Sequence, residues 1–259
     1  MRPVLFEVLG WPIHSYGFML AIAFLIGIFG VGRSAAKIGI SFDNIIDLGV
    51  WVLVGAIVGS RLAYVLTEYQ YFLKYPREII SINSGGLAFH GGLLGGFLAG
   101  FWYVKRHKIY PWKLADLVAP YIALGYAVVR IGCFLKGCCH GKTTTVAWAL
   151  RCAAHDDLLR HPTQIYSLLG SLLLFLILWR LRNHQRFPGF LFLLYFGLYS
   201  IMRFVVEFFR VGPLVFPWLT LAQLVCIIIA LIAFALIFLI ERRFNRGRSN
   251  PDASADLNR

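Results

Sequence analysis

Six ionisable side chains lie inside or at the edges of long apolar stretches of this 259-residue sequence: Arg61, His90, Arg130, Arg203, Glu207 and Arg210. Placing such a side chain within a membrane costs several kcal/mol, so those found there usually mark a functional site. Guanidinium groups also offer a planar fork of donors that suits phosphate oxygens. The set therefore predicts a membrane-embedded site for an anionic lipid headgroup.

Three of these residues share one stretch of sequence. Arg203, Glu207 and Arg210 are spaced by four and three residues, so in a helix they would share a face. One alternative is that Arg203 and Glu207 form a purely structural ion pair. Another is that arginines near helix ends simply extend toward the headgroups. Because the six residues come from four separate segments, the whole set favours anion recognition.

A cysteine cluster is a second candidate for chemistry. Cys133, Cys138 and Cys139 fall close together in the sequence. With His140 they offer soft ligands for a metal ion, although the spacing is not that of a zinc finger. A disulfide, for example to Cys152, is compatible with an oxidising compartment.

The same three thiols allow two other interpretations. A thiolate whose pKa is lowered by Arg130 or Lys142 could act as a nucleophile and carry a covalent lipid intermediate. Alternatively, the cysteines are small side chains that fill a pocket. Cys226, in the last apolar segment, is expected to be ordinary packing.

Long apolar segments must position these residues. Hydrophobic residues make up 59% of the chain and charged residues 14%, against about 45–50% and about 25% in soluble domains. This composition excludes a soluble enzyme, a disordered chain and a disulfide scaffold, and it predicts an all-α polytopic membrane protein. Seven segments are expected to span the membrane: Tyr16–Val31, Ile45–Leu66, Gly86–Val104, Leu114–Gly132, Ile165–Trp179, Gly189–Phe209 and Trp218–Ile240.

The distribution of positive charge predicts the orientation of the chain. The formal net charge is +13, but the basic residues form short clusters between apolar segments, which is not typical of a nucleic-acid-binding surface. Clusters such as Lys105–Lys108 and Arg242–Arg243 favour a cytoplasmic location for their loops, with the N-terminus outside and the C-terminus inside. Residues 1–244 are predicted to form one transmembrane domain, and residues 245–259 a disordered cytoplasmic tail.

This orientation brings polar residues from six segments to one depth, near the outer leaflet. We therefore expect the site to open toward the periplasmic side. Its members are Tyr16, Arg61, His90, Arg130, Gln164, Tyr166, Arg203, Glu207 and Arg210.

Glycines recur at every fourth residue in two of the segments. Gly55 and Gly59 show this spacing, as do Gly92, Gly96 and Gly100. Small residues at this spacing let helices approach closely, so tight helix packing is expected there.

Several motifs resemble one bacterial family. Ser84–Gly92, which contains His90-Gly91-Gly92, resembles the His-Gly-Gly segment of the phosphatidylglycerol–prolipoprotein diacylglyceryl transferases. Other blocks match in the same order along the chain. They are Pro12–Gly17, Gly59–Val65, Leu114–Asp116, Arg130–Gly132, His161–Tyr166 and Arg203–Arg210.

The resemblance implies a seven-helix protein of the bacterial inner membrane that acts in lipoprotein biosynthesis. Its substrates would be phosphatidylglycerol and the lipobox cysteine of a preprolipoprotein, and its products a thioether and glycerol phosphate. Other membrane lipids would surround it. No metal or diffusible cofactor, and no nucleic-acid partner, is expected.

The resemblance also implies residue roles. His90 would be the base or an orienting group, Arg130 and Arg203 would stabilise the phosphate, and Tyr16 would donate a hydrogen bond. The expected substrate-binding residues are Arg61, Gly91, Gly92, Gly141, Gln164, Tyr166, Glu207 and Arg210.

The chain departs from the family's signature after Arg130. Cys133 and Lys136 stand in place of two asparagines, and Cys138 in place of a glutamate. Thiols are weak donors and acceptors, so the headgroup contacts must differ. The alternatives are therefore a divergent member with another acceptor or donor, an anion-binding or transport protein, and a thiol-redox or metal-handling protein on the same scaffold.

Overall fold

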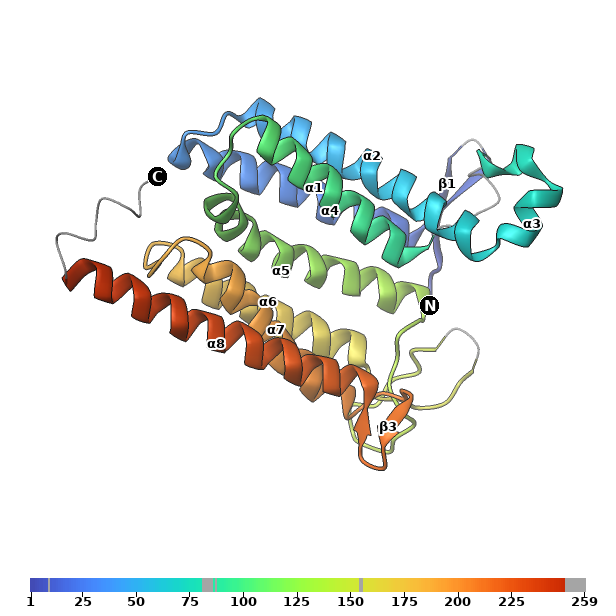
Figure 1. The fold of residues 1–259 in the computed structure, drawn as a ribbon. Helices are drawn as coiled ribbons and strands as arrows, with labels where there is room; N and C mark the ends of the chain where they lie inside the picture. The colour runs from blue at the N-terminus through green and yellow to red at the C-terminus, as the bar shows by residue number, and fades with distance from the viewer. Residues whose placement is uncertain (9, 81–85, 87, 154–155, 250–259) are drawn as a thin grey trace. The chain divides into compact units, whose positions relative to one another are not determined.

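The computed structural model describes residues 1–8, 10–80, 86, 88–153 and 156–249 of the protein. Within them the chain is mostly helical (Figure 1). Two short hairpins, which the apolar pattern did not predict, pair β1 (Val4–Val8) with β2 (Trp11–His14) and β3 (Leu214–Phe216) with β4 (Leu219–Thr220). The α-helices are α1 (Ser15–Ala35), α2 (Phe42–Thr67), α3 (Tyr69–Lys74), α4 (Phe89–Arg106), α5 (Pro111–Lys136), α6 (Thr163–Leu181), α7 (Phe190–Glu207) and α8 (Leu221–Ser249).

Each of the seven predicted segments contains a long helix. Among the described residues, six of these helices are long and apolar enough to cross a membrane, namely α1, α2, α5, α6, α7 and α8. Helix α4 is not among the six, because it is rich in glycine and ends in Lys105 and Arg106. A mostly helical, polytopic membrane protein is thus confirmed, whereas the seventh span and the orientation of the termini stay predictions.

The last helix differs from its predicted bounds at both ends. It starts at Leu221 rather than Trp218, because β4 occupies Leu219–Thr220. It continues to Ser249, so the predicted tail begins as helix at residue 245, and its remainder, 250–259, lies outside the described residues.

The chain divides into two compact units, described separately below. One unit comprises Met1–Phe29 and Ala115–Arg259, and the other Gly30–Leu114. In the larger unit, α7 packs against α6 and α8. Its apolar core contains Ala119, Ala123, Leu174, Leu178, Phe187, Phe190, Leu191 and Tyr195.

A buried carboxylate fixes the start of α7. The Asp116 side chain, 1% exposed, accepts hydrogen bonds from the backbone N–H groups of Gly189 (2.7 Å) and Phe192 (3.0 Å). The first N–H groups of a helix lack partners within the helix, and a negative charge there is favourable. Asp116 therefore ties α5 to the beginning of α7.

In the smaller unit, α2 and α4 pack along a line of glycines. A Cβ atom added at Gly59 would lie 2.5 Å from the carbonyl oxygen of Gly91 and 2.8 Å from the Cα of Gly95. A Cβ at Gly95 would overlap the carbonyl oxygen of Gly55. The predicted close packing is confirmed, and Gly91 and Gly95 make the tightest contacts on α4.

Arg61 of α2 organises the segment that follows its own helix. Its guanidinium donates hydrogen bonds to the backbone carbonyls of Glu78 (2.5 Å), Ile79 (2.9 Å) and Gly86 (3.0 Å). The side chain is 8% exposed and lies over the ring of Phe72. This arginine satisfies carbonyls that α3 and the turn after it would otherwise leave without donors.

The glycine packing can be tested with two matched substitutions. We expect Gly95→Ala to destabilise the protein by about 1–3 kcal/mol, because the new methyl group overlaps backbone that cannot rotate away. Gly27→Ala in α1 is the control, since nothing lies within 4 Å of its Cβ position. Melting temperatures in detergent would measure both; equal values would contradict the α2–α4 packing.

The role of Arg61 can be tested in the same way. We expect Arg61→Ala to speed amide hydrogen exchange in residues 68–79, because three carbonyls lose their donor. Arg77→Ala, on the exposed surface of that segment, is the control. Unchanged exchange together with a raised KM for lipid would instead assign Arg61 to substrate binding.

Candidate functional site

Two arginines share one buried carboxylate at the end of α7. Glu207 is 4% exposed, and its Oε2 lies 2.6 Å from Nη1 of Arg203 and 3.6 Å from Nε of Arg210. The spacing of four residues places Arg203 and Glu207 on one face of α7, as predicted, whereas Arg210 lies in the turn that follows the helix. Because burial in an apolar bundle penalises an isolated charge, Glu207 is stabilised by both arginines.

Arg130 of α5 interacts differently. Its Nη2 donates a hydrogen bond to the Tyr126 hydroxyl (2.5 Å), and its guanidinium lies over the Tyr126 ring. Its Nη1 lies 3.9 Å from the sulfur of Cys133. Among the described residues no carboxylate lies within ion-pair distance of Arg130.

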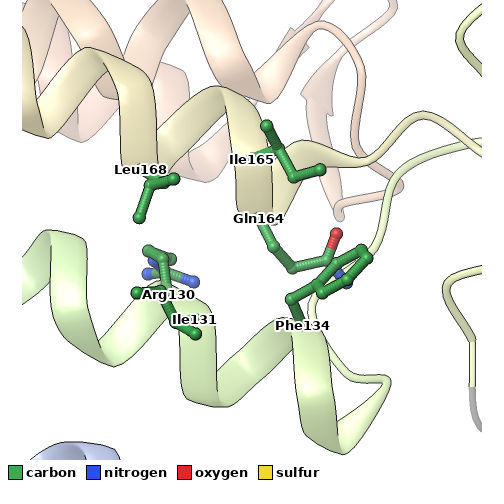
Figure 2. A pocket seen from close by; sticks show the side chains of 6 residues that line it. All are labelled: Arg130, Ile131, Phe134, Gln164, Ile165 and Leu168. Carbon is green, nitrogen blue, oxygen red and sulfur yellow. The ribbon is translucent and has the colours of Figure 1, made fainter. Parts of the chain in front are cut away.

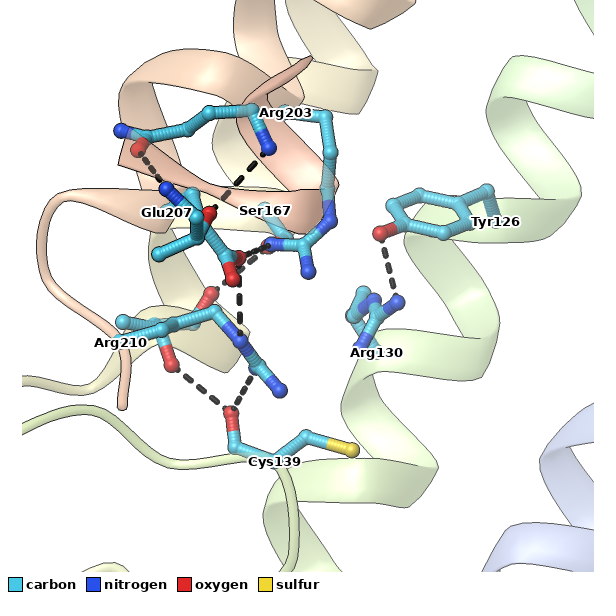
Figure 3. A network of polar contacts seen from close by, with 10 residues as sticks. Tyr126, Arg130, Cys139, Ser167, Arg203, Glu207 and Arg210 are labelled. Atoms are coloured by element: carbon cyan, nitrogen blue, oxygen red, sulfur yellow. Dashed lines mark hydrogen bonds and ion pairs between the residues drawn. The ribbon is translucent and has the colours of Figure 1, made fainter. Parts of the chain in front are cut away.

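These contacts leave an excess of positive charge. Figure 3 shows the guanidinium groups of Arg130, Arg203 and Arg210 turned toward one region between α5 and α7. Three guanidinium groups face a single carboxylate there, which is a surplus of two positive charges. Such a surplus in an apolar surrounding favours binding of an anion.

A small pocket lies beside Arg130. It has a volume of about 80 Å³ and lies between α5 and α6 (Figure 2). Two buried polar atoms on its lining residues, Nε of Arg130 and Oε1 of Gln164, have no hydrogen-bond partner among the described residues. The surface that lines the pocket is apolar, so these two atoms are buried beside the pocket and do not form part of its wall. Its lining consists of Arg130, Ile131, Phe134, Gln164, Ile165 and Leu168.

The loop after α5 is held by side chains from α6 and from the turn that follows α7. Arg210 Nη1 and Thr163 Oγ1 each donate to the Cys139 carbonyl (2.7 Å), and Gln164 Nε2 donates to the Cys138 carbonyl (2.8 Å). Cys139 has a φ of 63°, a conformation that side chains other than glycine rarely adopt. The three hydrogen bonds hold this strained turn in place.

The turn gathers the three cysteines. The sulfur atoms of Cys133, Cys138 and Cys139 all lie within 4.8 Å of one another. The pKa of the Cys139 thiol is lowered far below its usual range, because the Cys133 thiol donates a hydrogen bond to it and Cys138, Arg130 and Arg210 add to the effect. All five cysteines of the chain are free thiols in the structure, so the disulfide alternative finds no support.

Tyr16 lies near the same cluster. A Cβ on Gly132 would come within 3.1 Å of the Tyr16 Cα, so α1 crosses α5 next to Cys133. The Tyr16 ring is half-buried, with the Lys136 ammonium 5.7 Å from its centre. Lys136, which stands at a departure from the family signature, therefore lies beside a predicted catalytic residue.

Gly141 lies in the loop that leads into α6, and Tyr166 lies in the first turn of that helix. The Gly141 N–H donates to the His161 carbonyl (2.9 Å), and a Cβ there would overlap the Phe209 carbonyl. Tyr166 accepts a hydrogen bond from the Trp148 indole (2.8 Å), and its hydroxyl lies 3.1 Å from the Nδ1 of His161. Gly141 thus permits a close backbone approach, and Tyr166 helps to order the loop.

The remaining predicted residues lie in the smaller unit. His90 is exposed in the first turn of α4, with Phe89 as its ring neighbour. Gly91 and Gly92 face α2, and the Arg61 guanidinium binds the backbone carbonyls described above. The other predicted residues, and the three cysteines, all belong to the larger unit.

Three contributing residues did not emerge from the sequence. Tyr126 precedes Arg130 by four residues, a spacing that predicts contact in a helix and could have identified it. Thr163 and Ser167 are also four residues apart, and Thr163 falls in the block His161–Tyr166, yet neither is among the predicted site residues. Thr163 holds a backbone carbonyl of the cysteine loop, and Ser167 donates to the carbonyl of Thr163 (2.8 Å).

Comparisons with known proteins agree with these observations. Residues 3–239 match the sequence model of a family described as prolipoprotein diacylglyceryl transferase. Relatives named phosphatidylglycerol–prolipoprotein diacylglyceryl transferase include one from Pseudomonas aeruginosa (strain UCBPP-PA14), 37% identical over 93% of this chain and 94% of its own. Another, from Geobacter sulfurreducens, is 33% identical over 93% of this chain and 96% of its own. The chain therefore belongs to the prolipoprotein diacylglyceryl transferase family.

Proposed function

We propose that this protein transfers the diacylglyceryl group of phosphatidylglycerol to the lipobox cysteine of preprolipoproteins. The match to the family over residues 3–239 carries the proposal. The surplus of guanidinium groups around Glu207 supports it, because the lipid donor carries a phosphate.

The reaction builds negative charge on the leaving group. The acceptor sulfur attacks the glyceryl carbon, and the bond from that carbon to the phosphate oxygen breaks. The phosphodiester monoanion then departs as glycerol phosphate with a second negative charge, and the thiol proton is released. Groups that bind this added charge lower the barrier, since they interact more strongly with the transition state than with the substrate.

The larger unit supplies the groups for this step. Arg130 and Arg203 would bind the phosphate oxygens, and Glu207 would position Arg203 and Arg210. The apolar pocket between Arg130 and Gln164 would take up an apolar part of the lipid beside its headgroup. Tyr16 would donate a hydrogen bond.

The role of His90 rests on the His-Gly-Gly motif of the family. The proposal assigns it as the base or an orienting group for the acceptor thiol, roles that an imidazole ring can fill. Its exposure in the first turn of α4 leaves the ring available to a substrate.

The location of the site is also part of the proposal. Seven spans are supported by the seven apolar segments, and an external N-terminus with a periplasmic site by the charge pattern of the loops. The bacterial inner membrane is what the family implies. Residues 1–244 would then act as one transferase domain.

A direct assay tests the proposed reaction. The purified protein in phosphatidylglycerol vesicles should add a diacylglyceryl group to a lipobox peptide and release glycerol phosphate, both detectable by mass spectrometry. A peptide with serine in place of the lipobox cysteine, and vesicles of phosphatidylethanolamine alone, are the controls. A folded protein that leaves the lipobox peptide unmodified in phosphatidylglycerol vesicles would refute the proposal.

A second test addresses the arginines. We expect Arg203→Lys to lower kcat by about 10²-fold, because lysine keeps the charge beside Glu207 but lacks the fork that binds two phosphate oxygens. Arg186→Lys is a matched control, since Arg186 also pairs with a glutamate, Glu241 (2.9 Å), but on the exposed surface. Equal activity of the two variants would remove Arg203 from phosphate stabilisation.

A further inference from the structure

The cysteine cluster has no assigned part in the reaction described above. Its three sulfur atoms come from the end of α5 and from the turn that follows, and all lie within 4.8 Å of one another. Three thiolates around one Zn²⁺ ion, at about 2.3 Å each, lie about 3.8 Å apart. The sulfur atoms are therefore near the spacing that a shared ion needs.

The backbone holds this arrangement before any ligand binds. Hydrogen bonds from Thr163, Gln164 and Arg210 fix the carbonyls of Cys138 and Cys139, and Cys139 keeps its left-handed φ of 63°. Figure 3 shows the Cys139 side chain directed from the turn toward α5. A strained turn stabilised in this way is typical of a functional site rather than of residues that only fill space.

We propose that Cys133, Cys138 and Cys139 bind a Zn²⁺ ion, and that its fourth coordination position takes up the thiol of the acceptor peptide. Three protein ligands with one open position are the usual arrangement of a catalytic rather than a structural zinc site. A metal-bound thiol is deprotonated, so the acceptor would be held as a thiolate ready to attack carbon. The second half of this inference rests on the proposed transferase function.

The charges around the cluster support a thiolate-rich metal site. Zn²⁺ with three thiolates has a net charge of −1, and a fourth thiolate makes it −2. Arg130 lies 3.9 Å from the Cys133 sulfur, and Arg210 binds the Cys139 carbonyl. These two arginines thus offset part of the charge of the metal-bound thiolates.

The step balances in atoms and charge. The acceptor thiol gives its proton to solvent or a base when its sulfur binds Zn²⁺. The sulfur then forms a bond to the glyceryl carbon while the bond from that carbon to the phosphate oxygen breaks, and the electron pair leaves with glycerol phosphate. The product thioether is a weaker ligand than a thiolate, so it dissociates and frees the fourth position.

Metal binding can be measured without any turnover. The full-length protein, purified with reductant in phosphatidylglycerol micelles, should bind one Zn²⁺ per chain by elemental analysis. Cys133→Ser, Cys138→Ser and Cys139→Ser should each weaken binding by more than about tenfold. Cys226→Ser, in α8 and outside the cluster, should bind as the unaltered protein does. No bound zinc, zinc retained by all three variants, or a disulfide among the three cysteines would overturn the proposal.

Thiol uptake has its own signal. Co²⁺ in place of Zn²⁺ should give sulfur-to-cobalt charge-transfer absorption, which a lipobox peptide shifts and its serine version does not. Removing the metal from the unaltered protein should abolish lipid transfer, and Zn²⁺, but not Mg²⁺, should restore it. Full transfer without metal would overturn the catalytic half alone. Cobalt bands that respond to the peptide without any transfer would refute the phosphatidylglycerol reaction and leave the metal site standing.

Discussion

The pairing of Glu207 with Arg203 and Arg210 is the interaction on which the described site depends. A carboxylate that is 4% exposed in an apolar bundle is stable only with charged or hydrogen-bonding partners. Two arginines provide them, and Arg210 extends the connection to the Cys139 carbonyl at 2.7 Å. One buried acid thereby fixes both the orientation of two guanidinium groups and the conformation of the loop that carries the cysteines. The single negative charge of Glu207 balances only one of the two positive charges, so the pair of arginines still attracts an anion.

Buried polar groups at the other elements follow the same rule but serve the fold. Asp116 satisfies N–H groups at the start of α7, and Arg61 satisfies carbonyls beyond α2. By type and burial these residues resemble the site residues. They differ in that their hydrogen-bond partners are backbone groups of the protein. Arg130 and Gln164, by contrast, each keep a buried polar atom without a hydrogen-bond partner among the described residues, as do Ser15 and Glu207.

This distinction also explains what the sequence could and could not predict. Apolar segment length located all seven long helices, and helical spacing placed Arg203 beside Glu207, whereas Arg210 reaches Glu207 from the turn after α7. The partners of Arg61 could not be predicted, because a backbone carbonyl is the same group at every residue. The two hairpins were missed because strands of two to five residues give too short a pattern. The closeness of the cysteines in the sequence was visible, but the approach of their sulfur atoms depends on the left-handed turn at Cys139.

The chemistry of the product narrows what the cysteines can do. If one of them attacked the glyceryl carbon itself, the enzyme would carry the lipid as a thioether. Passing the lipid on would then require a second thiol to displace a thiolate from an alkyl carbon, and a thiolate is a far poorer leaving group than a phosphate. A cysteine nucleophile would therefore stop after one turnover. Three cysteines that bind the acceptor through a metal keep their own sulfur atoms unalkylated. The cluster therefore supports repeated turnover as a set of metal ligands but not as a nucleophile.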